Sequence, residues 1–206
     1  MVAGRVRRIA LTGGIATGKS HIRARFEQLG VPTIDSDILA REAVAPGTAG
    51  LAAVVEAFGP EVLQADGSLN RRKLADVVFA DPAVRKSLEA IIHPEVRRAI
   101  DAWFAALDAE EHPFAIADIP LLYEVGRERD FEAVIVAACD PETQVRRVMK
   151  RDGISEADAR RRIGAQLSIE EKARRAAYVI RTDGLFEDTD RQVRDLFDAL
   201  SKAART

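Results

Sequence analysis

The sequence predicts an α/β fold, in which helices cover both faces of a parallel β-sheet. Short apolar segments alternate with amphipathic helical segments, which is typical of such sheets. A glycine-rich segment, residues 13–20, lies between the first predicted strand and the first predicted helix. Asp35 and Asp37 follow the second predicted strand, at the edge where such sheets bind ligands.

The first elements are a strand, a helix and a second strand. The helix carries Ile22, Phe26 and Leu29 on one face, and Gly30 and Pro32 end it. Helical patterns then continue to residue 79, with breaks at Pro-Gly, Gly-Pro and Asp-Gly pairs. The predicted strands lie at residues 6–11, 31–34, 114–119, 131–138 and 178–180, and the remaining helices at residues 88–107, 141–151, 155–166 and 187–200.

Two helix boundaries have specific signals. Pro94 lies inside the apolar pattern of residues 88–107, so we expect a boundary or a kink near His93. Ser155 and Asp158 resemble a capping box at the start of the helix that follows. We expect a single kinase-type domain, with a core at about residues 5–45, 112–140 and 176–203. A helical substrate-binding lobe is expected at about residues 46–111 and a lid at about residues 141–166.

Composition limits the possible functions. The 206 residues carry a net charge of −2, which argues against a general affinity for nucleic acid. No apolar run reaches 18 residues, so we expect no membrane span, and we expect a cytoplasmic protein. Cys139, the one cysteine, lies in an apolar segment and is expected in the core. The sequence gives no sign of an oligomer interface, and we expect a monomer.

The glycine-rich segment fits the pattern G-x-x-x-x-G-K-[ST] of a phosphate-binding loop (P-loop). Its glycines let backbone N–H groups face phosphates, and the N-terminus of the following helix favours an anion. Lys19 is expected to reach the β- and γ-phosphates of ATP, and the Ser20 hydroxyl to bind Mg²⁺. The alternative is a strand-to-helix turn without a ligand. The Asn-Lys-x-Asp motif of GTPases is absent and large ATPases need more chain, so a small-molecule kinase remains.

The acidic pair has two interpretations. A carboxylate here could accept a proton from an attacking hydroxyl or hold the water shell of Mg²⁺, and we expect both to point to one side of an extended segment. The alternative is helix capping. We favour catalysis for Asp37 and capping for Asp35 or Ser36.

Residues 146–162 contain seven basic and three acidic residues. Arg147 and Arg151 are four residues apart and would share one helix face, where they could clamp ATP phosphates. A solvated basic face is the alternative. His93 could be a packing residue, and Leu121, Leu122 and Tyr123 could contact an organic substrate or belong to the core.

The chain resembles the dephospho-CoA kinase family from about Arg8 to Leu200. The resemblance depends on six segments: Leu11-Thr12-Gly13-Gly14-Ile15 with Gly18-Lys19-Ser20, Ile34-Asp35-Ser36-Asp37 with Ala40-Arg41-Glu42, Leu88-Glu89 with Ile92-His93-Pro94, Asp118 to Glu124, Gln144 with Arg147 and Arg151, and Gln166. The family carries both a His-Pro and an Ile-Pro-Leu-Leu segment, a combination that makes the resemblance specific.

The resemblance implies that the ribose 3′-hydroxyl of dephospho-CoA attacks the γ-phosphate of ATP bound with Mg²⁺, giving coenzyme A and ADP. Asp37 matches the proposed general base, and Lys19 and Arg147 would act on the transferring phosphate. The implied nucleotide site is Gly13, Gly14, Ala16, Thr17, Gly18, Lys19, Ser20, His21, Arg147 and Arg151. The implied substrate site is Asp35, Asp37, His93, Leu121, Leu122 and Tyr123, with Ser20 and Asp35 as metal ligands.

The chain departs from the family pattern in three places. Ala16-Thr17 replaces Gly-Ser inside the loop, and His21 replaces a small hydroxyl residue after Ser20. Thr182 stands where the family has an asparagine that could hold adenine. Two rival functions remain: a kinase for another nucleoside or nucleotide hydroxyl, and a nucleotide-binding regulatory module without turnover. The presence of Lys19, Ser20 and Asp37 argues against the second.

Overall fold

The structure, a computed structural model, describes residues 5–110 and 112–203. The chain divides into two compact units, one formed by the residues up to Ile34 together with those from Phe104 onward, and one formed by Asp35–Trp103. No helix within the described residues is long and apolar enough to cross a bilayer.

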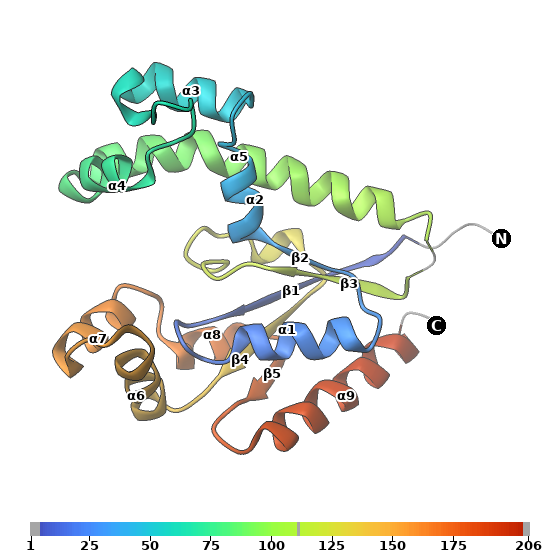
Figure 1. Cartoon of the computed structure of the whole chain (residues 1–206). Coiled ribbons are helices and arrows are strands. Elements are labelled where there is room, and N and C mark those ends of the chain that lie inside the picture. Colours follow the sequence, from blue (N-terminus) through green and yellow to red (C-terminus); the bar gives the residue numbers. More distant parts are fainter. Residues whose placement is uncertain (1–4, 111, 204–206) are drawn as a thin grey trace. The chain divides into compact units, whose positions relative to one another are not determined.

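The first unit is built on a five-stranded sheet, as the sequence predicts (Figure 1). Its strand order is β2-β3-β1-β4-β5, and β1 pairs in parallel with both β3 and β4. The strands are β1 (Arg7–Gly13), β2 (Thr33–Asp35), β3 (Phe114–Asp118), β4 (Ala133–Ala138) and β5 (Tyr178–Arg181). Strand β1 therefore lies in the middle of the sheet and delivers the glycine-rich segment to its carboxyl edge.

Two helices cover one face of this sheet, α1 (Lys19–Gln28) and α9 (Phe186–Ala203) (Figure 1). Ile22 and Phe26 of α1 and Leu200 of α9 are fully buried in one cluster with Ile9 and Phe114 of the sheet. Burying such side chains stabilises the fold by about 1.5–3 kcal/mol each. The unit also contains α6 (Pro141–Asp152), α7 (Glu156–Gly164), α8 (Ile169–Arg175) and the short helix η2 (Glu128–Asp130).

The second unit is helical. It contains α2 (Ser36–Glu42), α3 (Ala49–Phe58), η1 (Pro60–Val62), α4 (Arg71–Ala80) and most of α5 (Pro82–Leu107). Val44, Leu51, Val54 and Leu69 belong to its own apolar cluster. The unit thus has a core separate from that of the sheet.

Three details differ from the sequence-based prediction. Of the predicted boundary or kink near His93, the boundary was wrong, because helix α5 continues through Pro94. Pro94 is exposed, where water can solvate the carbonyl group that a proline leaves unpaired. Helix α8 was not predicted. Asp35 and Asp37 do not share an extended segment, because α2 begins between them at Ser36.

Cys139 follows β4 and is fully buried, as predicted. Desolvation by the surrounding core raises the pKa of its thiol above the ordinary value.

Candidate active site

Glycine suits the close packing and the backbone conformation of the P-loop at three positions. A β-carbon on Gly13 would lie 2.6 Å from Thr17 Oγ1, and one on Gly14 would lie 2.5 Å from Gln144 Nε2. Gly18 has φ +85°, a left-handed conformation that side chains disfavour, and Ala16 adopts φ +59°. Thr17 Oγ1 donates to Gly14 O at 2.9 Å and closes the loop from inside. These constraints hold a tight strand-to-helix turn.

Helix α1 begins directly after this loop. Gly18 is its N-cap and offers no side-chain acceptor, and the first turn contains no acidic residue. The first N–H groups of a helix have no intrahelical partner and carry a partial positive charge. The loop and the start of α1 therefore form a site for an anion, and the side chain of Ser20 in that turn is exposed.

Lys19 and Asp118 form an ion pair at the carboxyl edge of the sheet. Lys19 Nζ donates to Asp118 Oδ1, and the Asp118 side chain is only 1% exposed. The pairing of β1 with β3 places Asp118 opposite Leu11, two residues before the loop. Arg23 Nε of α1 lies 3.6 Å from Asp118 Oδ2. A buried carboxylate thus lies beside the lysine expected to bind phosphate.

Two glutamines hold the tip of the loop. Gln144 Nε2 donates to Ile15 O at 2.8 Å, and Ile15 N donates to Gln166 Oε1 at 2.9 Å. Ile15 and Ala16 also pack against an apolar cluster centred on Val148 of α6 and Ala159 of α7. The predicted lid helices are therefore attached to the loop by hydrogen bonds and by packing.

Arg147 is linked to the loop through Thr182. Its Nη1 donates to Thr182 Oγ1 at 3.0 Å and its Nη2 to Thr182 O at 2.5 Å. The Thr182 hydroxyl donates to Thr17 O at 2.8 Å. Thr182, the residue that departs from the family pattern, therefore joins the arginine to the loop.

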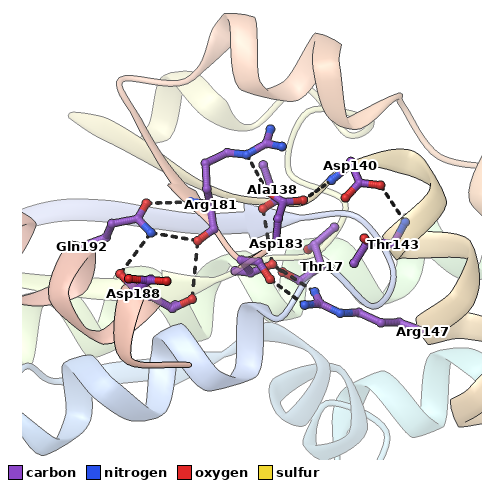
Figure 2. Close-up of polar contacts among 11 residues, drawn as sticks. Thr17, Ala138, Asp140, Thr143, Arg147, Arg181, Asp183, Asp188 and Gln192 are labelled. Atoms are coloured by element: carbon purple, nitrogen blue, oxygen red, sulfur yellow. Dashed lines mark hydrogen bonds and ion pairs between the residues drawn. The ribbon is translucent and has the colours of Figure 1, made fainter. Parts of the chain in front are cut away.

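A second network surrounds the start of α6 (Figure 2). Asp140 caps this helix by accepting from Thr143 N at 2.8 Å, and its own N–H donates to Asp183 Oδ1 at 2.5 Å. Asp183 also accepts from Arg181 Nε at 2.8 Å. Hydrogen bonds from Thr143, and then the contact with Asp183, lower the pKa of Asp140 to about 2. Asp140 is therefore a structural anion.

Arg151 differs from Arg147. It is about half exposed, and its Nε donates to Asp152 at 2.7 Å, which raises the pKa of the guanidinium. Both arginines belong to α6, but only Arg147 has bonds to a residue that also contacts the loop.

The side chain of His21 contacts α9. Its Nε2 lies 2.8 Å from Asp190 Oδ1, which also pairs with Arg25 Nε at 3.0 Å. The His21 ring lies against Phe186, with centroids 4.8 Å apart. These contacts explain the departure from a small residue: His21 joins α1 to α9.

Lys172 of α8 is fully buried. Its Nζ donates to Gly13 O at 3.3 Å and to Pro120 O at 3.2 Å, and it pairs with Glu124 Oε1 at 2.8 Å. Glu124 in turn accepts from Leu167 N at 3.0 Å. A buried ammonium group requires such partners. Lys172 thus ties the first glycine of the loop to the segment that follows Asp118.

The Leu121-Leu122-Tyr123 segment is partly in the core and partly at the surface. Leu121 is 43% exposed, whereas Leu122 and Tyr123 are buried. Burial raises the pKa of Tyr123, and the Arg175 guanidinium lies 4.4 Å from its ring centroid. Leu121 is the member of the segment that a ligand can reach.

The second unit carries Asp35, Asp37 and His93. Asp35 Oδ1 accepts from Asp37 N at 2.8 Å and from Ile38 N at 3.4 Å, so it caps α2 as favoured from the sequence. Asp37 lies in the first turn of α2 and is exposed, and His93 is exposed on α5.

Sequence reasoning missed three features of the site. Asp118 was assigned no role, although it ends a buried strand beside the loop strand, which is a recognisable signal. Gln144 and Gln166 were recognised in family segments but not as partners of Ile15. Lys172 had no signal, because its neighbours on α8 are mostly charged and indicate a solvated face.

Comparison with known proteins gives one consistent result. The family model described as dephospho-CoA kinase matches residues 7–188. A dephospho-CoA kinase from Anaeromyxobacter dehalogenans is 48% identical over 195 residues, covering 93% of this chain and 92% of the relative.

Two solved structures are similar over nearly the whole chain. One, from Thermus thermophilus, is 36% identical with a TM-score of 0.81, covering 96% of this chain and 99% of its own. The other, a dephospho-CoA kinase from Campylobacter jejuni, is 28% identical with a TM-score of 0.74, covering 95% and 98%. The phosphate-binding geometry and these relatives thus point to the same activity.

Proposed function

This chain belongs to the dephospho-CoA kinase family, and from that premise we propose how its residues transfer a phosphoryl group from ATP to dephospho-CoA. The reaction phosphorylates the ribose 3′-hydroxyl and yields coenzyme A and ADP, the last step of coenzyme A synthesis. The observation that carries the residue assignment is the ion pair of Lys19 with the buried Asp118 at the end of the P-loop strand.

The loop binds the β- and γ-phosphates of ATP. Backbone N–H groups of residues 13–20 and the N-terminus of α1 donate to the phosphate oxygens, because these groups lack acceptors within the helix. Lys19 adds a positive charge next to the γ-phosphate, where negative charge develops during transfer. The side chain of His21 has no phosphate role here, since it joins α1 to α9.

Oxygen ligands for Mg²⁺ are present in the first unit. The exposed Ser20 hydroxyl and the Asp118 carboxylate would hold Mg²⁺ through hard oxygen donors, and the ion would supply positive charge that offsets the charge of the phosphates. No group of three or more acidic, histidine or cysteine ligands occurs among the described residues, which fits a metal that keeps water and phosphate ligands. We assign Asp118 this role in place of Asp35, which caps α2.

Asp37 acts as the general base. It is exposed at the first turn of α2, and Asp35 fixes that turn by accepting from its N–H group. Its carboxylate accepts the proton of the ribose 3′-hydroxyl as the oxygen attacks the γ-phosphate.

Arg147 stabilises the transferring phosphate from the lid. Its two hydrogen bonds to Thr182 orient the guanidinium, and Thr182 also contacts the loop. The same guanidinium neutralises the charge that spreads over the γ-phosphate oxygens. Arg151 supports this role only weakly, because it is exposed and paired with Asp152.

We further propose that His93 and Leu121, both exposed, contact dephospho-CoA. The division into core, substrate lobe and lid also belongs to this proposal, and the compact unit Asp35–Trp103 overlaps most of the lobe predicted at residues 46–111. The enzyme acts in the cytoplasm, where ATP is available and where a free thiol such as that of Cys139 persists. It acts as a monomer. Light scattering during size-exclusion chromatography tests the monomer.

Steady-state assays test the reaction. ADP release is measured with dephospho-CoA, adenosine and AMP as acceptors, and the product is checked by mass spectrometry for a 3′-phosphate. We expect dephospho-CoA to give by far the highest kcat/KM. Equal rates with all three acceptors would contradict the assignment.

A further inference from the structure

A cavity of about 510 Å³ lies within the second unit, and no role has been assigned to it. It is formed by the segment after α2, by the loop before α4 and by the first turn of α4. Its lining consists of Arg41, Val44, Ala45, Pro46, Gln64, Ser68, Leu69, Asn70, Arg71 and Arg72. Three arginines therefore border one cavity, and no carboxylate does.

The three guanidinium groups are available for a ligand. Arg41, Arg71 and Arg72 are exposed, and none of them forms an ion pair with a carboxylate of the described residues. This is unusual in a chain where most arginines of the lid pair with an acidic neighbour. Three unpaired positive charges around one cavity repel each other, and an anion between them removes that repulsion.

The geometry favours a phosphorylated ligand. Arg71 Nη2 donates to Arg41 O at 3.4 Å, so the start of α4 is joined to α2. Arg71 and Arg72 occupy the first turn of the ten-residue helix α4, which Asn70 caps and which has no acidic residue in that turn. The helix dipole and the guanidinium groups therefore attract the same anion.

The remaining wall of the cavity is partly apolar. Val44 and Leu69 are buried members of the apolar cluster of this unit, and Ala45 and Pro46 continue that surface. A free phosphate would leave this wall uncovered. A diphosphate that continues into an organic arm would cover it, and dephospho-CoA has this form.

Helix α2 relates the cavity to the reacting hydroxyl. Asp37 and Arg41 are both exposed and lie four residues apart on α2, which places their β-carbons roughly 5–6 Å apart on one helix face. The 3′-hydroxyl and the 5′-diphosphate of dephospho-CoA belong to the same ribose. A base at Asp37 and an anion site at Arg41 therefore match two groups of one sugar.

We propose that this cavity binds the diphosphate of dephospho-CoA through Arg41, Arg71 and Arg72, with the pantetheine arm along Ala45 and Pro46. The proposal rests on the assigned reaction and on Asp37 as its base. It names the substrate feature that distinguishes dephospho-CoA from simpler nucleosides.

The test uses full-length Arg41→Gln, Arg72→Gln and the double variant. Each substitution removes a positive charge that would donate hydrogen bonds to the diphosphate. We therefore expect the KM for dephospho-CoA to rise about 10- to 100-fold per arginine, while the KM for ATP stays unchanged. Arg98→Gln is the matched control, because Arg98 is exposed on α5 of the same unit and pairs with Glu95. Circular dichroism confirms that each variant is folded.

Assays with different acceptors show whether the loss of activity in the variants comes from a lost contact with the diphosphate. The kcat/KM for adenosine, which has no phosphate, should not change in the arginine variants. The kcat/KM for AMP should fall by a smaller factor than the kcat/KM for dephospho-CoA. An equal loss with AMP would overturn the assignment of a diphosphate. An equal loss with adenosine, a parallel rise in the KM for ATP, or variants that behave like wild type would overturn the site itself.

Calorimetric binding of dephospho-CoA without ATP gives a second measurement. Its affinity should fall in the variants by the same factor as the KM rises, and an unchanged affinity would overturn the site. If wild-type enzyme does not phosphorylate dephospho-CoA, the assigned reaction fails. If it does and the variants are unaffected, only the cavity proposal fails.

Discussion

Lys172 and Gly13 are 159 residues apart in the sequence, yet the Lys172 ammonium donates to the Gly13 carbonyl oxygen at 3.3 Å in the interior of the first unit. The same group reaches Pro120 O and Glu124. One buried cation therefore fixes the position of the P-loop relative to the segment that follows Asp118.

Replacement of Lys172 by methionine should destabilise the protein. The change leaves two carbonyl oxygens and the Glu124 carboxylate without their buried partner, so we expect the free energy of unfolding to fall by about 3–5 kcal/mol. Urea unfolding at pH 7 measures it. The KM for ATP should also rise, because Gly13 is no longer held.

The double variant Lys172→Met/Glu124→Gln is the control. Removing both charges should cost less than the sum of the single changes, since no unpaired carboxylate remains. If the losses of unfolding free energy in the two single variants add up in the double variant, the Lys172 and Glu124 charges do not stabilise each other.

Asp37→Asn should preserve ATP affinity but lower kcat by about 10²–10⁴-fold, the usual contribution of a general base. Pre-steady-state measurement of the chemical step, together with ATP binding, tests this. Wild-type turnover in the Asn variant would remove Asp37 from the chemistry.

Asp118→Asn should raise the Mg²⁺ concentration needed for half-maximal rate by at least about tenfold, because a metal-directed carboxylate is lost. Titration of activity with MgCl₂ at fixed ATP measures the shift. Asp198→Asn, an exposed change on α9, should leave the midpoint unchanged. A midpoint that does not move in Asp118→Asn would assign the metal to other ligands.

Arg147→Lys and Arg151→Lys should differ. Lysine cannot reproduce the two bonds from Arg147 to Thr182, so we expect kcat/KM for ATP to fall by about 10-fold or more. Arg151 forms an exposed pair with Asp152, so its replacement should have little effect. Equal losses in the two variants would contradict the distinction between them.

The Asp140 cap should stabilise the fold in a pH-dependent way. The pKa of Asp140 is lowered to about 2 in the folded state, so its contribution is present above the unfolded pKa of about 3.9 and disappears as the pH falls through about 2. Asp140→Asn keeps a capping acceptor but cannot ionise. The stability difference between the two proteins should therefore be constant above about pH 5 and shrink from about pH 4 to pH 2.

The sequence predicted the elements whose signals are local. The P-loop motif, the apolar strands and the caps formed by Asp35 and Ser155 all depend on neighbouring residues, and the structure contains each of them. Helix α8 escaped prediction because Ile169 is its one large apolar residue among charged neighbours.

The missed parts of the site depend on contacts between distant segments. Lys172 appears solvated until α8 is placed against Gly13, and His21 has a partner only once α9 brings Asp190 to α1. Pro94 shows the opposite case. Its local signal for a helix boundary was overruled by packing on both sides, because Ile91 and Ile92 before it pack against the apolar cluster and Val96 and Ile100 after it are buried.

The burial of Cys139 has a consequence for an enzyme whose substrate and product both carry a thiol. Thiol–disulfide exchange needs an accessible thiolate, and Cys139 is fully buried with a raised pKa. Oxidised dephospho-CoA therefore meets no cysteine with which to form a mixed disulfide. We expect the kinase to retain full activity without added reductant and to tolerate thiol-detecting reagents in a direct assay of its substrate.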